Sequence, residues 1–215
     1  TVVAIGWDGA ARGILVVADT VKPTSAEAIR GLKEIGLTPV LLTGDNEAVA
    51  RQIAAEVGIE EVIAEVLPKD KVDVVTRLQG EGKIVAMVGD GVNDAPALAQ
   101  ADVGIAIGAG TDVAIASAGV ILASSDPRSV LSIIQLSRRA YGKMKQNLWW
   151  AAGYNLLSVP LAAGILAPVG FVLPMSIGAI LMSASTVVVA LNAQLLRRID
   201  LTPEASTRSV LERQK

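Results

Sequence analysis

The longest uncharged stretch of the chain limits its fold more than any other feature. From Gln146 to Leu196 there is no Asp, Glu, Lys or Arg. Because one bilayer crossing takes ~20 apolar residues, this stretch is long enough for two membrane spans. Proline and glycine residues around Ala167–Gly170 divide it, so we expect spans at about Leu148–Ala167 and Gly170–Leu196.

Basic residues lie on both sides of this stretch. They are Arg138, Arg139, Lys143 and Lys145 before it, and Arg197 and Arg198 after it. Lys and Arg collect at the cytoplasmic ends of membrane helices, so both ends should lie in the cytoplasm and the spans should form a hairpin in a lipid bilayer. The alternative is a buried helical hairpin in a soluble protein. So long an uncharged run with basic residues at both ends fits this alternative poorly.

The composition excludes several classes of function. The 215 residues include no Cys and no His, and the net charge is −2. These counts exclude a disulfide scaffold, a zinc finger and Cys- or His-based catalysis, and they argue against a nucleic-acid partner. Residue 1 is Thr rather than Met, so we expect the chain to be a piece of a longer protein.

The first 145 residues alternate between strand-like and helical patterns. Strand-like runs occur at Val2–Ile5, Gly13–Ala18, Pro39–Leu42, Glu61–Val66, Ile84–Val88, Val103–Ile107 and Gly119–Leu122, and helical patterns at Ser25–Ile35, Glu47–Val57, Lys69–Gln79 and Ala95–Ala101. Strands that are apolar on both faces and alternate with helices predict an α/β fold with a doubly wound parallel sheet. The first two strands flank the short turn Asp8-Gly9, so they should form an antiparallel hairpin.

The remaining segments complete the expected architecture. Asp126–Asn147 should be a long helix that continues into the first span, so that the α/β unit is joined to a two-helix transmembrane hairpin. We expect 146–199 to be the membrane pair and 200–215 to be a mobile, polar cytoplasmic tail.

Three strand ends carry residues suited to phosphate chemistry, because ligands of parallel sheets bind at the carboxyl ends of strands. Thr43, Gly44, Asp45 and Asn46 offer a hydroxyl and backbone amides at a helix N-terminus, which suits an anion. The same pattern also fits a simple helix cap by Asp45 or Asn46.

The second strand end reads Gly-Asp-Gly-Val-Asn-Asp-Ala-Pro over residues 89–96. Mg²⁺ is usually held by one or two carboxylates, waters and a substrate phosphate, so Asp90 and Asp94 are candidate ligands. Lys71 opens a helix after another strand, and beside a phosphate it would stabilise transferred charge.

These strings resemble the phosphorylation domain of the P-type ATPases, a branch of the haloacid-dehalogenase-like superfamily. The resemblance rests on residues 43–45 and 87–98, and it extends through 101–106 and 110–114. The resemblance implies that Asp90 and Asp94 bind Mg²⁺ and that Asn93 organises the phosphate. It also implies that Thr43 and Lys71 contact the phosphoryl group. Gly44 and Asp45 would lie where the phosphates of ATP pass. Asp19, Lys22 and Pro23 would form the hinge between residues 1–18, the end of a nucleotide-binding domain, and a phosphorylation domain at 19–145.

One part of the family pattern is absent. The phosphorylated aspartate of the family lies in an Asp-Lys-Thr-Gly-Thr string, which this sequence lacks. The resemblance therefore implies that these residues are the C-terminal portion of a pump, inactive alone, whose partners are the actuator domain, the nucleotide-binding domain and the upstream membrane helices of the same protein.

Polar residues in the spans indicate the transported ion, since such residues usually mark a transport path. Neither span contains a carboxylate, and methionine sulfur favours soft ions such as Cu(I). Gly153-Tyr154-Asn155 and Met182-Ser183-Ala184-Ser185-Thr186 resemble the copper-exporting branch of the heavy-metal P-type ATPases. That resemblance implies ion contacts from Tyr154, Asn155, Met182, Ser183 and Ser185, copper as Cu(I) or Cu(II) with silver as a companion, and a bacterial or archaeal cell membrane.

Two other functions remain open. A truncated, membrane-anchored product would bind metal or nucleotide without turnover. A membrane-anchored phosphatase would need Asp19 as its nucleophile, but the residues that follow it, Thr20-Val21-Lys22, lack the second catalytic acid that such phosphatases place two residues on.

Overall fold

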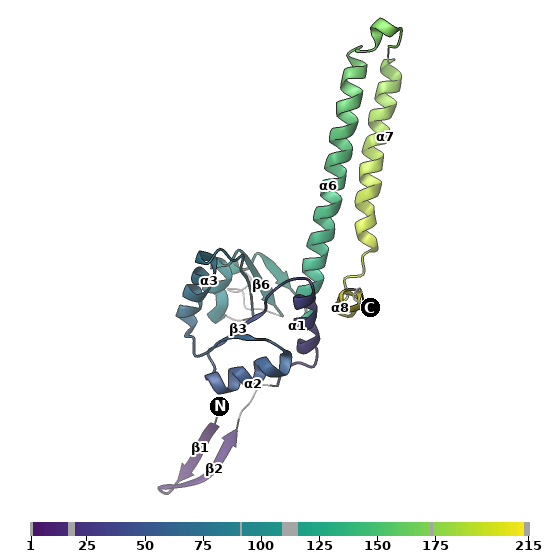
Figure 1. The fold of residues 1–215 in the computed structure, drawn as a ribbon. Coiled ribbons are helices and arrows are strands. Elements are labelled where there is room, and N and C mark those ends of the chain that lie inside the picture. Colours follow the sequence, from purple (N-terminus) through teal and green to yellow (C-terminus); the bar gives the residue numbers. More distant parts are fainter. Residues whose placement is uncertain (1, 17–19, 91, 109–115, 173, 213–215) are drawn as a thin grey trace. The chain divides into compact units, whose positions relative to one another are not determined.

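The computed structural model describes residues 2–16, 20–90, 92–108, 116–172 and 174–212. The chain divides into two compact units, residues 1–128 and residues 129–215 (Figure 1). Each unit has its own architecture and is described by itself.

The first unit begins with an antiparallel hairpin. Strand β1 (Val2–Trp7) pairs with β2 (Ala10–Val16), and the register shifts between Ile5 and Gly6. The turn residues Asp8 and Gly9 both have positive φ, 56° and 74°. Positive φ at both central residues is the geometry of the two-residue turn that matches strand twist, so the expected hairpin is confirmed.

The following strands are all parallel, as the α/β pattern predicts, and they form two groups. Strand β3 (Val40–Leu42) pairs with β4 (Glu61–Ile63), while β5 (Ala86–Gly89), β6 (Val103–Ile107) and β7 (Val120–Leu122) form a second sheet in that order. No ladder joins β3 to β5 among the described residues. The expected parallel sheet is therefore interrupted between these two strands.

Helices connect the parallel strands. They are α1 (Ser25–Glu34), α2 (Glu47–Val57), the 3₁₀ turn η1 (Pro68–Asp70), α3 (Lys71–Gly80), the 3₁₀ turn η2 (Val92–Asp94) and α4 (Ala95–Gln100). The expected helices are present within a few residues of their predicted bounds. Crossover helices of this kind are what parallel pairing requires.

A small apolar core lies under the second sheet. It consists of Val75, Met87, Ala97 and Leu98, with Leu42 among the partly buried side chains packed against it. A Cβ at Gly104 would lie 2.3 Å from the Leu98 carbonyl oxygen, so only glycine lets α4 approach β6 this closely. This packing fixes α4, and with it the loop that precedes it, against the strands.

The second unit is built on two long helices. Helix α6 (Arg128–Ala162) contains Pro160, and α7 (Met175–Gln194) follows the 3₁₀ turn η3 (Ala167–Val169) and leads into η4 (Leu195–Arg198). The single long helix expected to enter the first span is confirmed, but it ends at Ala162 rather than at Ala167. Only Met175–Arg198 is long and apolar enough to cross a membrane, judged on the described residues. Helix α6 carries charged residues, tryptophans, asparagines and two tyrosines that lower its hydropathy.

The expected mobile tail is partly helical. Helix α8 (Pro203–Leu211) is capped by Thr202, whose side chain accepts a hydrogen bond from the Ala205 amide. Ser206 and Thr207 are buried, and Gln135 of α6 donates to the Ser206 carbonyl at 2.7 Å. The sequence analysis did not predict this helix, although a polar sequence can carry a Thr-Pro helix start and pack through its small residues.

Candidate functional site

The loop after β3 holds Thr43 through its backbone and its side chain. The Thr43 amide donates to the Ile63 carbonyl at 3.0 Å, which continues the β3–β4 pairing by one residue. The Thr43 hydroxyl donates to the Asp45 carboxylate at 3.0 Å and accepts from the Asp45 amide at 3.1 Å. This turn presents a hydroxyl and a carboxylate together at the end of the strand.

The start of α2 shows which residue caps this helix. The Asn46 side chain accepts from the Val49 amide at 3.0 Å, so Asn46 is the N-cap. Asn46 therefore caps the helix, as the simple-cap interpretation proposed. Asp45 does not cap it, and its side chain accepts a hydrogen bond from the Thr43 hydroxyl instead. A Cβ at Gly44 would lie 3.2 Å from the Val66 carbonyl oxygen, which makes this turn tight.

The loop after β5 brings a carboxylate unusually close to the strand. A Cβ at Gly89 would lie 2.8 Å from the Asp94 Cβ and 2.9 Å from its Oδ2. Real Cβ atoms do not approach this closely, so Gly89 is required for Asp94 to occupy its position. Asp90 and Asn93 of the same loop are exposed, and Gly91 between them lies outside the described residues.

Lys71 reaches the loop after β5 from a different part of the chain. Its Nζ lies 2.6 Å from Asp94 Oδ1, and the two side chains are only 15% and 13% exposed. Lys71 opens α3 and Asp94 ends η2, so the contact joins two segments that are 23 positions apart in the sequence. The charges of a partly buried pair of this kind attract each other more strongly than those of a surface pair, because water screens them less.

The three predicted segments converge on one region of the first unit. Leu42, directly before Thr43, packs against the core that contains Met87 of β5 and Leu98 of α4. Lys71 and Asp94 are in direct contact, and Asp90 directly follows β5. The loops that follow β3 and β5 therefore lie around one core, at the carboxyl ends of parallel strands.

The donor chemistry of this region fits Mg²⁺. Asp90, Asn93 and Asp94 supply carboxylate and amide oxygens, which are hard ligands, and two of the three side chains are exposed. Among the described residues, no three Asp or Glu side chains gather into a group able to hold a metal by themselves. Such a site therefore suits an ion that keeps waters and takes phosphate oxygens as further ligands.

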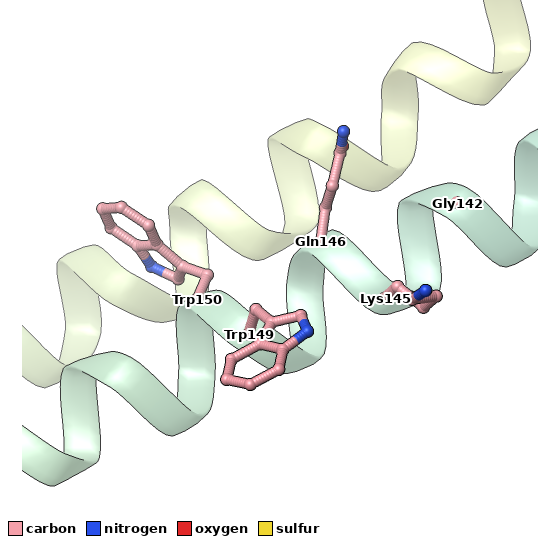
Figure 2. A pocket seen from close by; sticks show the side chains of 5 residues that line it. All are labelled: Gly142, Lys145, Gln146, Trp149 and Trp150. Atoms are coloured by element: carbon pink, nitrogen blue, oxygen red, sulfur yellow. The ribbon is translucent and has the colours of Figure 1, made fainter.

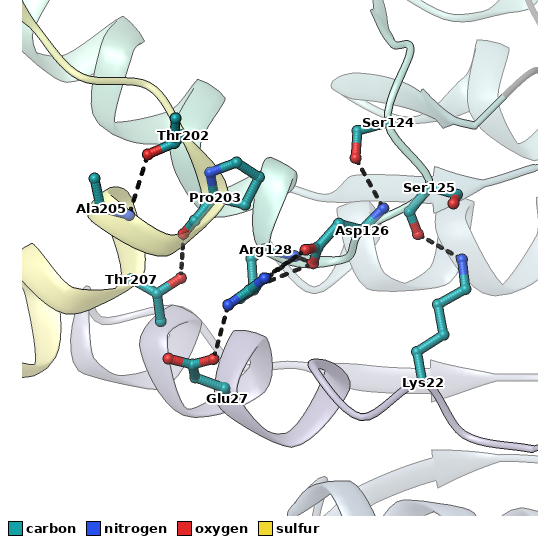
Figure 3. A network of polar contacts seen from close by, with 10 residues as sticks. All are labelled: Lys22, Glu27, Ser124, Ser125, Asp126, Arg128, Thr202, Pro203, Ala205 and Thr207. Carbon is teal, nitrogen blue, oxygen red and sulfur yellow. Dashed lines mark hydrogen bonds and ion pairs between the residues drawn. The ribbon is translucent and has the colours of Figure 1, made fainter.

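A polar network outside these loops was missed by the sequence analysis (Figure 3). Arg128 donates to both carboxylate oxygens of Asp126, at 2.8 to 3.3 Å, and to Glu27 of α1 at 3.2 Å. The hydrogen bond from the Arg128 guanidinium holds the pKa of Asp126 below its ordinary value of 3.8, with a smaller contribution from the Arg128 backbone amide. Glu27 and Arg128 are 101 positions apart in the sequence, so no local pattern could predict that they pair.

Of the expected hinge residues, Lys22 is anchored next to this network. Its ammonium donates to the Ser125 carbonyl, 103 residues away, and Pro23 lies in the turn before α1. Asp19 lies outside the described residues, as do residues 110–114 of the extended motif. The segment before α1 is thus tied to the segment before α6.

The expected ion-contacting residues divide between two faces of the helical hairpin. Tyr154 and Ser185 are partly buried, and the Ser185 hydroxyl accepts from the Trp150 indole N–H at 3.2 Å. Asn155, Met182 and Ser183 are exposed, with Met182 66% exposed. The five residues therefore do not form a closed site within this unit.

Two surface cavities lie elsewhere. An open cavity of about 670 Å³ is lined by Gly142, Lys145, Gln146, Trp149 and Trp150 of α6 (Figure 2). Another lies at the end of α1 and the starts of β3 and β4, and is lined by Lys33, Leu37, Thr38, Pro39, Glu60 and Glu61. Neither includes a residue of the loops that follow β3 and β5.

Comparison with known proteins agrees with the α/β fold described above. Residues 2–102 match a model of haloacid dehalogenase-like hydrolases, and residues 72–134 match a second model with the same description. The chain is 56% identical to a copper-exporting P-type ATPase B of Archaeoglobus fulgidus over 92% of its length, and 52% identical to one of Enterococcus hirae over 86%. It spans 28% and 25% of the lengths of these two relatives.

A solved structure extends the likeness to three dimensions. A zinc-transporting PIB-type ATPase in its E2.Pi state matches with a TM-score of 0.77 and 36% identity. The match covers 92% of this chain and 31% of that one. The α/β unit and the helices of the second unit are thus both represented in a P-type ATPase.

Proposed function

We propose that this chain forms part of an ATP-driven copper export pump. The proposal rests on two findings: the chain belongs to the haloacid-dehalogenase-like superfamily, and it is homologous along most of its length to copper-exporting P-type ATPases. Its share of the pump is the Mg²⁺ and phosphate site, together with part of the membrane ion path. The chain spans about a quarter of the relatives it matches, so the remainder of the pump is its principal partner.

The Lys71–Asp94 contact is the observation that carries this proposal. It joins a cation to an acidic loop at a strand end, with both side chains withdrawn from water. In the proposed site, Asp90 and Asp94 bind Mg²⁺, which offsets the negative charge of the phosphate when it is bound. Lys71, Thr43 and Asn93 orient the phosphoryl oxygens through an ammonium, a hydroxyl and an amide, while Gly44 and Asp45 shape the path of the ATP phosphates.

The interruption of the sheet fits a missing nucleophile strand. Strands β3 and β5 share a core through Leu42 and Met87 but exchange no ladder. We place the strand that bears the phosphorylated aspartate, which this sequence lacks, between them. Residues 19–145 are then a phosphorylation domain without its nucleophile, and this chain by itself does not hydrolyse ATP.

The helical hairpin provides the membrane part of the proposal. Helix α7 is long and apolar enough to span a bilayer, and we take the part of α6 from Gln146 onwards as a second span because the uncharged run begins there. Residues 146–199 then form a multi-pass segment of a bacterial or archaeal cell membrane, with the α/β unit in the cytoplasm. Asn155, Met182 and Ser183 are exposed. This exposure is expected if copper passes between this hairpin and other helices of the pump, because the residues that contact it must then face outwards.

The phosphorylated intermediate provides the test. The native gene product, purified from membranes, should form an acid-stable phosphoenzyme from labelled ATP when Mg²⁺ and copper are present, and Asp90→Asn should reduce it by orders of magnitude. The 215-residue chain alone should form none. A phosphoenzyme on the chain alone, or a native product no larger than this chain, would contradict the proposal.

A further inference from the structure

Three side chains near the basic end of the hairpin form a continuous polar chain between α6 and α7. The Lys143 ammonium donates to the Asn192 side-chain oxygen at 2.8 Å. The Asn192 amide nitrogen then donates to the Asn147 side-chain oxygen at 2.7 Å. Lys143 and Asn147 are one helical turn apart on α6, so both reach the same residue of α7.

These contacts belong to a longer inner face of the hairpin. Its partly buried positions include Lys143, Asn147, Ala151, Tyr154, Ser158 and Leu161 on α6, and Gly178, Ser185, Val189 and Asn192 on α7. They recur mostly at intervals of three or four residues, which places them on one face of each helix. The Trp150–Ser185 hydrogen bond links the helices again further along, towards Tyr154.

The chemistry of the three side chains makes their arrangement specific. Lys143 is a cation that lies at the edge of an uncharged stretch and donates to an amide oxygen. The side-chain amide of Asn192 uses both of its polar atoms, because its oxygen accepts from Lys143 and its nitrogen donates to Asn147. If α7 slid or rotated by one residue, these polar groups would face apolar side chains and lose their partners, which is costly for a desolvated group. Apolar positions of the same face, such as Val189, have no such directional preference.

We propose that Lys143, Asn147 and Asn192 form a polar clamp that fixes the register of α6 against α7. The clamp residues are positioning residues: they set Tyr154 and Ser185 on the shared inner face without contacting the transported ion. The register claim stands without the proposed function, whereas its consequence for copper transport rests on it.

Spin labels can measure the register directly, because the chain has no native Cys. We would label Leu156→Cys on α6 and Ile180→Cys on α7, both exposed, and record electron–electron distances on the full chain in lipid nanodiscs. The parent should give one narrow distance distribution. Asn192→Leu, which keeps the size but removes both hydrogen bonds, should broaden it about twofold, and Lys143→Met should broaden it less.

Two matched variants separate the clamp from general damage. Asn192→Asp should keep the narrow distribution, because its carboxylate can accept from both Lys143 and the Asn147 amide group. Gln194→Leu changes an exposed amide of the same helix and should leave the distribution unchanged. An unchanged distribution in both Asn192→Leu and Lys143→Met, or equal broadening in Asn192→Asp or Gln194→Leu, would overturn the proposal.

The native gene product separates this inference from the proposed function. If both hold, Asn192→Leu should lower copper-stimulated phosphoenzyme turnover several-fold and Asn192→Asp should restore most of it. A broadened distribution without any copper-stimulated phosphoenzyme in the parent would leave the clamp standing and overturn the pump. Full activity of Asn192→Leu despite a broadened distribution would overturn the claim that the clamp positions the ion path.

Discussion

The two units of this chain bury their apolar residues in opposite ways. In the first unit, Leu98 and Val75 are 1% exposed and lie inside a core. In the second, α7 has no buried residue, and large apolar side chains such as Leu156 and Met175 are 77% and 89% exposed. The first unit therefore has a core that hides part of its apolar surface from water, although Ile14 and Ile84 are 72% and 87% exposed. The helical hairpin instead requires another apolar environment, either lipid or further helices.

Truncating one leucine in each unit tests this difference with the largest expected effect. Leu98→Ala should lower the free energy of unfolding of the first unit by about 2–5 kcal/mol, because it leaves a cavity beside Val75 and Met87. Leu156→Ala should change the stability of the chain in detergent by less than about 0.5 kcal/mol. Chemical denaturation of both variants measures the effects, and similar losses would show that the hairpin hides a water-excluded core of its own.

Breaking the ion pair of the candidate site should have the next largest effect. Lys71→Met leaves the Asp94 carboxylate without its partner, and both side chains are mostly withdrawn from water. We expect the first unit to lose about 1–3 kcal/mol of stability. Arg77→Met, on the solvent side of the same helix, is the control in the same denaturation experiment, and an equal loss there would assign the effect to the helix rather than to the pair.

Acid should weaken the first unit through Asp126 before it affects the hairpin. The Arg128 guanidinium holds the pKa of Asp126 below 3.8 in the folded state, so the folded protein favours the ionised form. This contribution is fully present above the unfolded value and is lost as the pH falls through the folded pKa. Asp126→Asn should remove about 1 kcal/mol near neutral pH and reduce the loss of stability on acidification. Unfolding curves collected between neutral pH and pH 3 would contradict this if parent and variant kept parallel profiles.

A solvated pair of the first unit should contribute least. Arg51 and Glu47 form an i, i+4 pair at 2.6 Å, but their side chains are 67% and 60% exposed. Arg51→Ala should cost about 0.3–0.5 kcal/mol at low salt, and less at high salt. Measuring the same variant at two salt concentrations checks this, since a salt-independent loss would point to packing by the arginine stem instead.

Local patterns were sufficient to predict most elements of the fold. The bounds of α2 were predicted without error because a capping Asn46 and a C-terminal Gly58 mark both ends. The antiparallel hairpin of β1 and β2 was predicted from the turn Asp8-Gly9, and the long helix α6 from its unbroken helical periodicity. Helix α6 ends at Ala162, before the predicted end of the first span at Ala167, because hydropathy does not reveal where a helix stops.

Long-range contacts could not be predicted in the same way. Lys71 and Asp94 were each identified from their own strand ends, but only the packing of α3 and α4 shows that they meet. The Glu27–Arg128 pair and the docking of α8 depend on segments far apart in the sequence, and neither carries a local motif. The division of Tyr154 and Asn155 between two helix faces likewise follows from the partner helix rather than from the motif.

The most direct test of the account is phosphate binding by the site that the first unit supplies. Backbone amide signals of Thr43, Gly44 and Gly89 can be followed by NMR on the full chain in detergent, while Mg²⁺ and inorganic phosphate are added. We predict that the signals move together, in the millimolar range, only when both are present, and that Asp90→Asn removes the response. Signals that stay in place when both are present, or a full response in Asp90→Asn, would contradict the assignment of this site.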